Sequence, residues 1–427
     1  MAIHTRSLGA LIIAAAATTL VACGTLESTR DDTPPIGAPG SVAQGARAVP
    51  SSSYDVVHRF SRKGDPSAGL IDVNGTLYGT TYGRGGRGQG TVYSMTLAGV
   101  TKTIYVFHGP DGAGPRGVLL DVDGTLYGTT QYGGSSNDGV VFSVTTSGAE
   151  KVLYSFQNGS DGAYPYSGLI DVNGTFYGTT YAGGASDCYN GVGCGTVYSV
   201  SPSGAETVLH RFSASDGKSP YAAPVDLNGT LYGTTYAGGA SNQGVIYAIT
   251  TSGGERVIYN FHGGSDGAYP KAPLIAVKGT LYGTTYYGGG ISNCRADLGC
   301  GAVFSIKPNG EEHVLYSFSG NSDGSNPVAP LIDVHGTLYG TTFTGGAYPC
   351  GYLDLGCGTI YSLSESGSEN VLHAFTGDSD GAFPYAGLVS VGGKLYGDTN
   401  AGGTVSGCEE RGCGTAFSWP LRAPHHL

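Results

Sequence analysis

The stretch "GTLYGTT" at residues 75–81 decides the fold, because it occurs seven times in the chain. It returns, unchanged or with one or two substitutions, from residues 124, 174, 229, 279, 336 and 393, at intervals of about fifty residues. A fixed period of this length is the sequence signature of a repeat architecture, in which each copy is one supersecondary unit. The fold can therefore be worked out from a single copy.

Each copy contains four short runs that are rich in β-branched and aromatic residues and are bounded by turn residues. Around the third copy these runs are "KVLYSF" (151–156), "GLIDV" (168–172), "TFYGTT" (175–180) and "GTVYSV" (195–200). Such runs predict β-strands. Asn173-Gly174 predicts a type I′ hairpin between the second and third of these runs, because that turn needs positive φ at both residues. Four antiparallel strands per copy predict an all-β fold, a seven-bladed β-propeller.

The two ends of the repeat region predict how the ring closes. The first copy begins with a strand of the "KVLYSF" type, "VVHRF" (56–60), and the last copy ends with a strand of the "GTVYSV" type, "GTAFSW" (414–419). In a closed ring the N-terminal strand would complete the seventh blade beside the C-terminal one and leave no unpaired edge. The alternative is an open β-solenoid, which would need capping repeats that the end copies do not resemble.

The N-terminus resembles a bacterial lipoprotein signal peptide over residues 1–22. Arg6 precedes an apolar segment, "LGALIIAAAATTLVA" (8–22), and Cys23 follows it. The ending "LVAC" is similar to the bacterial lipobox, in which the cysteine becomes the first mature residue and carries a lipid. An ordinary secretory signal that happens to hold a cysteine is the alternative. We expect a lipid-anchored protein of the bacterial envelope, at the outer membrane or cell surface, with the membrane as its partner.

The remaining layout follows from composition. Residues 23–53 are rich in Gly, Pro and Ser and predict a disordered tether, residues 54–419 hold the propeller, and residues 420–427 form a short tail.

Charged residues make up 12% of the chain and the net charge is −11. This excludes a nucleic-acid partner, which needs a basic footprint. We expect a monomer without cofactors. The 30 tyrosines suit exposed strand faces and sugar-like ligands equally.

The sequences of the copies resemble a family of bacterial tandem-repeat proteins, the GloVer (Gloeo/Verruco) "choice-of-anchor" repeats. The matching motifs are "LYGTT", "YAGG" (181–184), "GTVYS", "VLYSF" and "DGAYPYSGLI", and the resemblance covers residues 54–419. It implies that Cys23 is the anchor of this member, and it implies no established activity. The last copy departs from the pattern with "GKLYGDT" (393–399), where Asp398 replaces a threonine. This departure puts the local turn in doubt.

Eight cysteines remain after Cys23, and they form four close pairs. The pairs are Cys188/Cys194, Cys294/Cys300, Cys350/Cys357 and Cys408/Cys413. Each pair falls between the strands of the "TFYGTT" and "GTVYSV" types, in a copy longer than those without cysteines. Zinc knuckles are one interpretation, but the spacings are not C-x2-C and no histidine recurs nearby. Disulfides that each close their own loop suit an exported protein better. No metal site is expected.

Antiparallel order places the cysteine-containing loops and the blade-to-blade loops on one face, the candidate binding rim. An aspartate recurs there, each time followed by Gly and, four residues on, by Pro: Asp111, Asp161, Asp216, Asp266, Asp323 and Asp380. One interpretation is an acidic ring that binds a cation or sugar hydroxyls. The other is a turn, in which Asp caps its own backbone and Gly supplies positive φ. Presence in every blade favours the turn.

Few features of the rim differ between copies. Arg84 and Arg87 lie in "YGRGGRGQG" (82–90), and Glu409 and Glu410 lie in "CEERGC" (408–413). These charges could contact a partner, although solvated loop charges explain them as well. Three histidines, His58, His210 and His373, take a strand position that tyrosines hold in other copies, and predict packing rather than a metal cluster.

Three functions follow as hypotheses. The first is a tethered, non-enzymatic binding propeller with a glycan or an envelope protein as ligand. The second is a carbohydrate-active hydrolase or lyase, which would use rim carboxylates at catalytic spacing. The third is a purely structural envelope protein. No sequence signature of a catalytic site is present, so the choice depends on what the loops bring together.

Overall fold

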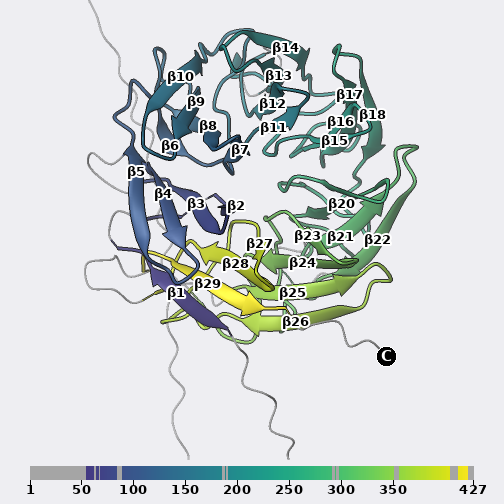
Figure 1. Cartoon of the computed structure of the whole chain (residues 1–427). Coiled ribbons are helices and arrows are strands. Elements are labelled where there is room, and N and C mark those ends of the chain that lie inside the picture. The colour runs from purple at the N-terminus through teal and green to yellow at the C-terminus, as the bar shows by residue number, and fades with distance from the viewer. Residues whose placement is uncertain are drawn as a thin grey trace, which may run out of the picture. The chain divides into compact units, whose positions relative to one another are not determined.

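Figure 1 shows the computed structural model of the chain, which describes residues 54–61, 64–66, 68–83, 89–184, 188, 191–290, 294, 298–350, 355–403 and 412–421. These residues belong to one compact unit, Pro50–Leu427. The predicted signal peptide and tether (residues 1–53), with Cys23, and residues 422–427 of the predicted tail lie outside the described residues. In the described part, no helix is long and apolar enough to cross a membrane.

The described strands form seven antiparallel sheets that follow one another around a ring (Figure 1), which confirms the predicted propeller. The innermost strands are β2 (Ile71–Val73), β7 (Leu120–Val122), β11 (Ile170–Val172), β15 (Val225–Leu227), β19 (Ile275–Val277), β23 (Ile332–Val334) and β27 (Val389–Val391). The second strands are β3 (Thr76–Thr81), β8 (Thr125–Tyr132), β12 (Thr175–Thr180), β16 (Thr230–Thr235), β20 (Thr280–Thr285), β24 (Thr337–Thr342) and β28 (Lys394–Thr399).

The third strands are β4 (Thr91–Thr96), β9 (Val140–Thr145), β13 (Thr196–Val200), β17 (Val245–Thr250), β21 (Ala302–Ile306), β25 (Thr359–Ser364) and β29 (Thr415–Pro420). The outermost strands are β5 (Thr101–Val106), β10 (Glu150–Ser155), β14 (Glu206–Arg211), β18 (Glu255–Asn260), β22 (Glu312–Ser317), β26 (Glu369–Ala374) and β1 (Asp55–Arg59). One further short strand, β6 (Ala113–Pro115), pairs with β8.

The hairpin between the first and second strands of each blade has the predicted turn. At Asn74 and Gly75 the φ angles are 53° and 81°, so both central residues have positive φ, as a type I′ turn requires. The Asp72 carboxylate accepts the backbone N–H of Gly75 at 2.9 Å. Local chemistry therefore sets the register of this hairpin.

The glycine inside "LYGTT" makes room for an aromatic ring from the third strand. A Cβ on Gly178 would lie 2.6 Å from the Tyr198 hydroxyl oxygen, and one on Gly128 would lie 2.7 Å from Cζ of Phe142. Side chains cannot approach that closely, so the position admits only glycine. Tyr198 and Phe142 are fully buried. The middle of each blade is thus a ring packed directly on backbone.

The N-terminal strand closes the ring as the sequence predicts. β1 pairs antiparallel with β29, with Val56 opposite Phe417, and the Phe60 N–H donates to the Gly414 carbonyl at 3.1 Å. Phe60 is buried against residues of the first and seventh blades. Tyr54 stacks on His373 of the sixth blade, with ring centroids 3.9 Å apart. The open solenoid is therefore excluded.

Disulfide bonds close three of the four predicted loops. The bonded pairs are Cys188–Cys194, Cys294–Cys300 and Cys350–Cys357. Cys413 is also disulfide-bonded, and its predicted partner, Cys408, lies outside the described residues. The zinc-knuckle alternative is excluded for the three described loops. The disulfides lie between the second and third strands, on the side of the blade-to-blade loops.

We predict that deletion of residues 54–61 destabilises the propeller. It removes the outer strand of the seventh blade and the buried Phe60 side chain, whose loss alone costs about 3–5 kcal/mol in a protein core. The exposed edge of β29 should also promote aggregation. Thermal unfolding and light scattering measure both effects. The control is deletion of residues 24–50, which removes none of the described strands. Equal behaviour of the two truncations would contradict the closure.

Candidate functional site

The six repeated aspartates cap their own blade-to-blade loops. The Asp161 carboxylate accepts the backbone N–H groups of Gln157 and Gly159, at 2.9 and 3.1 Å, and the Tyr154 hydroxyl at 3.0 Å. Each of the other five likewise accepts a backbone N–H from a residue three or four positions earlier. Although burial disfavours the Asp111 carboxylate, hydrogen bonds from Tyr105 and His108 hold its pKa below the usual value. These contacts match the predicted turn; ligand binding by this ring stays a prediction.

Two of the three histidines that alternate with tyrosines, His210 and His373, take the role of the tyrosine in the outermost strands. Tyr154 and Tyr259 donate to the aspartate of the following loop, and His210 and His373 each lie 3.1 Å from theirs. His58 instead contacts the Gly99 carbonyl, with its Nδ1 at 3.1 Å. Alternation between the two residue types therefore keeps a ring beside a carboxylate.

At five of the junctions between consecutive blades, a glutamate from the next blade lies near the loop aspartate. These glutamates were not among the predicted site residues. The glutamates are Glu150, Glu206, Glu255, Glu312 and Glu369, each four residues before the outer-strand ring of its own blade. Burial, and then the charge of Asp161, raise the pKa of Glu206 to about 7. Burial and Asp323 do the same for Glu369. The recurring E-x3-Y/H spacing was the available signal.

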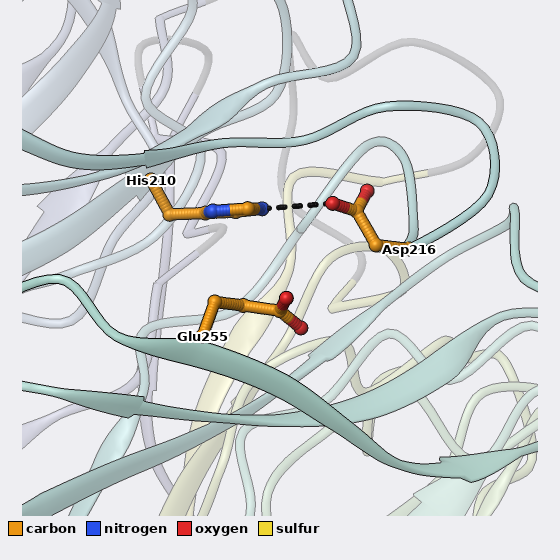
Figure 2. Close-up of side chains that lie close together, drawn as sticks. All are labelled: His210, Asp216 and Glu255. Atoms are coloured by element: carbon orange, nitrogen blue, oxygen red, sulfur yellow. Dashed lines mark hydrogen bonds and ion pairs between the residues drawn. The ribbon is translucent and has the colours of Figure 1, made fainter.

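Figure 2 shows the junction between the third and fourth blades, where His210, Asp216 and Glu255 meet. One ligand atom from each lies within 4.8 Å of the other two, and His210 Nε2 is 3.1 Å from Asp216 Oδ2. Imidazole with two carboxylates is a donor set that divalent transition metals accept. Tyrosine takes the histidine position in most other junctions, so the interblade scaffold alone accounts for this cluster.

The position after each repeated proline faces the ring axis and differs between copies. Six of its occupants line one cavity of about 90 Å³, called here the axial cavity: Arg116, Tyr166, Tyr221, Lys271, Val328 and Tyr385. The seventh, Ser67, lies outside the described residues. Because the six described copies contribute four residue types (Arg, Lys, Val and three Tyr), this is the asymmetric constellation that a ring of aspartates cannot supply.

A continuous group of tyrosines borders the axial cavity. Tyr166, Tyr181 and Tyr221 contact one another with centroid separations of 5.1–5.3 Å, and Tyr221 contacts Tyr236 at 5.3 Å. These four half-buried residues are called here the tyrosine wall. Tyr166 and Tyr221 follow repeated prolines, whereas Tyr181 and Tyr236 follow the repeated "GTT". The wall therefore joins two loop types from neighbouring blades.

Two cations lie among these rings. The Lys271 Nζ is 3.8 Å from the Tyr286 ring centroid and 5.2 Å from that of Tyr236. Burial lowers the pKa of Lys271 to about 8. The Arg116 guanidinium carbon is 4.3 Å from the Tyr82 ring centroid, and its Nε donates to Gln131 Oε1 at 2.8 Å. Neither cation has an ion pair within the described residues, and no described residue lining the cavity is acidic.

The disulfide loops hold the residues that line the axial cavity. The N–H groups of Ser219 and Phe383 donate to the carbonyls of Cys194 and Cys357, both at 2.8 Å. Ser219 and Phe383 have positive φ, 56° and 57°, and directly precede the prolines before Tyr221 and Tyr385. Such backbone strain in non-glycine residues persists where the surroundings enforce it and clusters at binding sites. In two copies without cysteines, Tyr164 and Tyr269 donate in the same way to the carbonyls of Asp138 and Gln243, so the loop backbone holds the cavity wall with or without a disulfide.

Hydrogen bonds between neighbouring blades fix the same segments from the other side. The Thr129 hydroxyl donates to the Ser167 carbonyl at 2.6 Å, and the Thr179 hydroxyl donates to the Ala222 carbonyl at 3.0 Å. Ser167 and Ala222 directly follow Tyr166 and Tyr221 in the sequence. In these two blades the first threonine of "LYGTT" is therefore a positioning residue for the cavity.

In the seventh blade Asp398 replaces this threonine. It lies inside β28 opposite Ala416, not in a turn, which corrects the expectation from the sequence. Its exposure is 1%, and neither carboxylate oxygen has a hydrogen-bond partner among the described residues. Burial, and then the charge of Asp65, raise the pKa of Asp398 well above its usual value. The folded state therefore favours the protonated acid.

We predict that Asp398→Thr stabilises the protein at neutral pH. An unfolded aspartate releases its proton near pH 4, whereas folded Asp398 retains it to higher pH, so this group makes the free energy of unfolding fall as pH rises from about 4 through its folded pKa. Removing an unsatisfied buried carboxyl should add about 1–3 kcal/mol at pH 7.5. The gain should shrink at pH 4.5. Urea unfolding at both pH values measures this difference.

The matched control is Thr234→Asp, which places the same group at the corresponding buried position of the fourth blade. This variant should lose stability at pH 7.5 and recover part of it at pH 4.5. A gain for Asp398→Thr that is equal at both pH values would show that Asp398 is not protonated in the folded state.

None of the described residues of the predicted rim lines the axial cavity. The six aspartates lie in the blade-to-blade loops, and Arg84, Arg87, Glu409 and Glu410 lie outside the described residues. The predicted rim rested on the repeated Asp and Pro, whereas the cavity is lined by the residue after each proline. Its variation between copies, from Arg and Lys to Tyr and Val, was the signal for the cavity.

Comparison with known proteins supports the fold. The Gloeobacter/Verrucomicrobia repeat matches residues 46–192 and 189–417. No curated protein shows significant sequence similarity to the chain. Among solved structures, a mutant puromycin hydrolase complexed with PGG is 12% identical, with a TM-score of 0.51 and coverage of 80% of this chain and 51% of that chain.

Two further structures resemble the chain at a lower level. A luciferin-regenerating enzyme is 10% identical, with a TM-score of 0.42 and coverage of 84% of this chain and 94% of that one. The PQQ-bound aldose sugar dehydrogenase from Streptomyces coelicolor is 12% identical, with a TM-score of 0.40 and coverage of 86% and 98%. Likeness at such identities concerns the fold alone. The repeat match spans most of the chain, which therefore belongs to the Gloeobacter/Verrucomicrobia repeat family.

Proposed function

We propose that this member of the Gloeobacter/Verrucomicrobia repeat family is a non-enzymatic binding propeller that recognises carbohydrate at its axial cavity. The observation that carries the proposal is the tyrosine wall beside a cavity whose lining differs from blade to blade. Tyrosine rings offer flat apolar faces for the C–H faces of a sugar, and their hydroxyls bind sugar hydroxyls. A rigid concave site with a few polar groups is the usual form of a ligand site.

A hydrolase or lyase is the second candidate, and the lining of the cavity favours it less. A glycosidase needs two carboxyl groups about 5–9.5 Å apart, on either side of the scissile bond. The described residues that line the axial cavity include no Asp or Glu. A purely structural envelope role would leave the tyrosine wall and the two cations without a use.

We further propose that the propeller is tethered to the bacterial envelope by a lipid on Cys23. The support is the sequence "LVAC" at the end of the apolar N-terminal segment. The anchor would hold the propeller on a length of chain rich in Gly, Pro and Ser. Such a tether lets a binding surface search its surroundings.

We predict that Cys23→Ser moves the protein from the membrane to the soluble exported fraction, because the substitution removes the only proposed site of lipid attachment. Fractionation and metabolic labelling with a fatty acid measure the change. The control is Ser28→Ala in the same segment, which should remain membrane-bound and labelled. Membrane association that survives Cys23→Ser would overturn the lipid anchor.

We predict that Tyr221→Val weakens glycan binding by at least tenfold, about 1.4 kcal/mol. Valine occupies the corresponding position in the sixth blade as Val328, so the fold should tolerate it. A glycan array identifies a bound carbohydrate, and calorimetry measures its affinity. The control is Tyr348→Val, which removes a tyrosine that is 48% exposed and does not line the axial cavity. Equal losses in both variants, or binding to no glycan, would contradict the proposal.

A further inference from the structure

We propose that the axial cavity is an anion site, which takes the carboxylate of an acidic saccharide between Lys271 and Arg116. The inference rests on the proposed function and names the chemical class of its ligand, a uronic-acid glycan. The sugar ring would lie on the tyrosine wall, and its carboxylate would enter the cavity.

The charge of the residues that line the axial cavity favours an anionic ligand. The chain has 32 acidic and 21 basic residues, yet the described lining of the axial cavity holds two cations and no acid. Half-buried cations are costly unless a counter-charge or a ring compensates them. Tyrosine rings compensate in part, with Lys271 against Tyr286 and Arg116 against Tyr82. A bound anion would supply the missing counter-charge.

The size of the axial cavity limits the group that can enter it. A protein cavity of about 150 Å³ can hold a benzene molecule, so a cavity of about 90 Å³ holds a smaller group. A carboxylate fits this space, whereas a whole pyranose ring is too large for it. A sugar with a charged substituent can therefore be anchored by that substituent while its ring stays outside the cavity.

The neighbours of Arg116 orient its guanidinium before any ligand binds. Its guanidinium lies between the rings of Tyr82 and Tyr166, 4.3 and 5.3 Å from their centroids, and Nε is held by Gln131. These contacts fix the plane of the guanidinium fork beside the cavity. A planar fork matches a carboxylate bidentately, and Lys271 adds a point charge from the fifth blade.

The surroundings of Lys271 make its charge the one that changes near neutral pH. The rings packed around Lys271 are Tyr221, Tyr236 and Tyr286. Burial raises the pKa of Tyr221 and Tyr286 far above neutrality, and Arg116 stays charged throughout. Because burial lowers the pKa of Lys271 to about 8, anion binding should weaken as pH rises through 8. Lys271→Arg should remove this weakening, since arginine keeps its charge.

The experiment is isothermal titration of the purified full-length protein with polygalacturonate, dextran sulfate and neutral dextran at pH 7 and pH 9.5. The variants are Lys271→Met and Lys271→Arg. Methionine keeps an unbranched side chain of similar length and removes the charge. The control is Lys278→Asn, which removes one positive charge from an exposed hairpin turn, where three other copies have Asn.

The expected result is that polygalacturonate binds at least tenfold more tightly than dextran at pH 7. Lys271→Met should weaken this binding tenfold or more and Lys278→Asn should not, while only Lys271→Arg should keep its affinity at pH 9.5. Equal binding of dextran and polygalacturonate would overturn the anion site and leave the proposed function standing. If dextran sulfate binds as tightly as polygalacturonate, the preference for a carboxylate is overturned. Binding of none of the three would overturn the inference and the proposed function together.

Discussion

Every blade depends on the close approach of an aromatic ring to a glycine. The ring comes from the third strand and the glycine from the repeated "LYGTT" of the second, as with Tyr361 against Gly340, where a Cβ would lie 2.5 Å from the hydroxyl oxygen. The hydroxyl itself is not what is needed: in Tyr198 and Tyr361 it is buried without a partner among the described residues, and Phe142 and Phe304 serve the same purpose. Packing on bare backbone therefore fixes how the second and third strands lie together, and the other strands add to that pair.

The joints between blades follow from a second repeated device, the aspartate that caps each blade-to-blade loop. It is held by a ring of its own outer strand and lies near a glutamate of the next, so consecutive blades share a cluster of polar groups. At the ring closure Tyr54 takes the glutamate position and stacks on His373 instead. The junction between the sixth and seventh blades thus uses aromatic packing where five others use a carboxylate. This substitution suits a strand that arrives from the opposite end of the chain.

Most of the fold could be predicted from the sequence because its causes are local. The Asn74-Gly75 turn, the glycine under the ring and the short cysteine loops each depend on residues close in sequence, and they are repeated three, seven and four times respectively. The closure by β1 followed from counting strand types. Asp398 was misplaced because a single substitution within a repeat was judged as a turn feature, whereas its neighbours in the strand bury it.

The axial cavity could not be predicted in the same way, because no single copy contains it. Each copy contributes one side chain after its proline, and only the closed ring brings Arg116, Tyr221 and Lys271 to a common point. Repetition identifies what a scaffold needs, so a search for repeated residues finds the aspartates and passes over the variable position beside them. The backbone of that position is held by the proline, by the loop between the second and third strands of the preceding blade and, in two copies, by a threonine of the neighbouring blade. Its side chain carries no part of the fold, as the exchange of Tyr, Lys, Arg and Val among copies shows. A propeller built this way can change its ligand by changing a few residues at the axis, while the strands and junctions that support them stay the same.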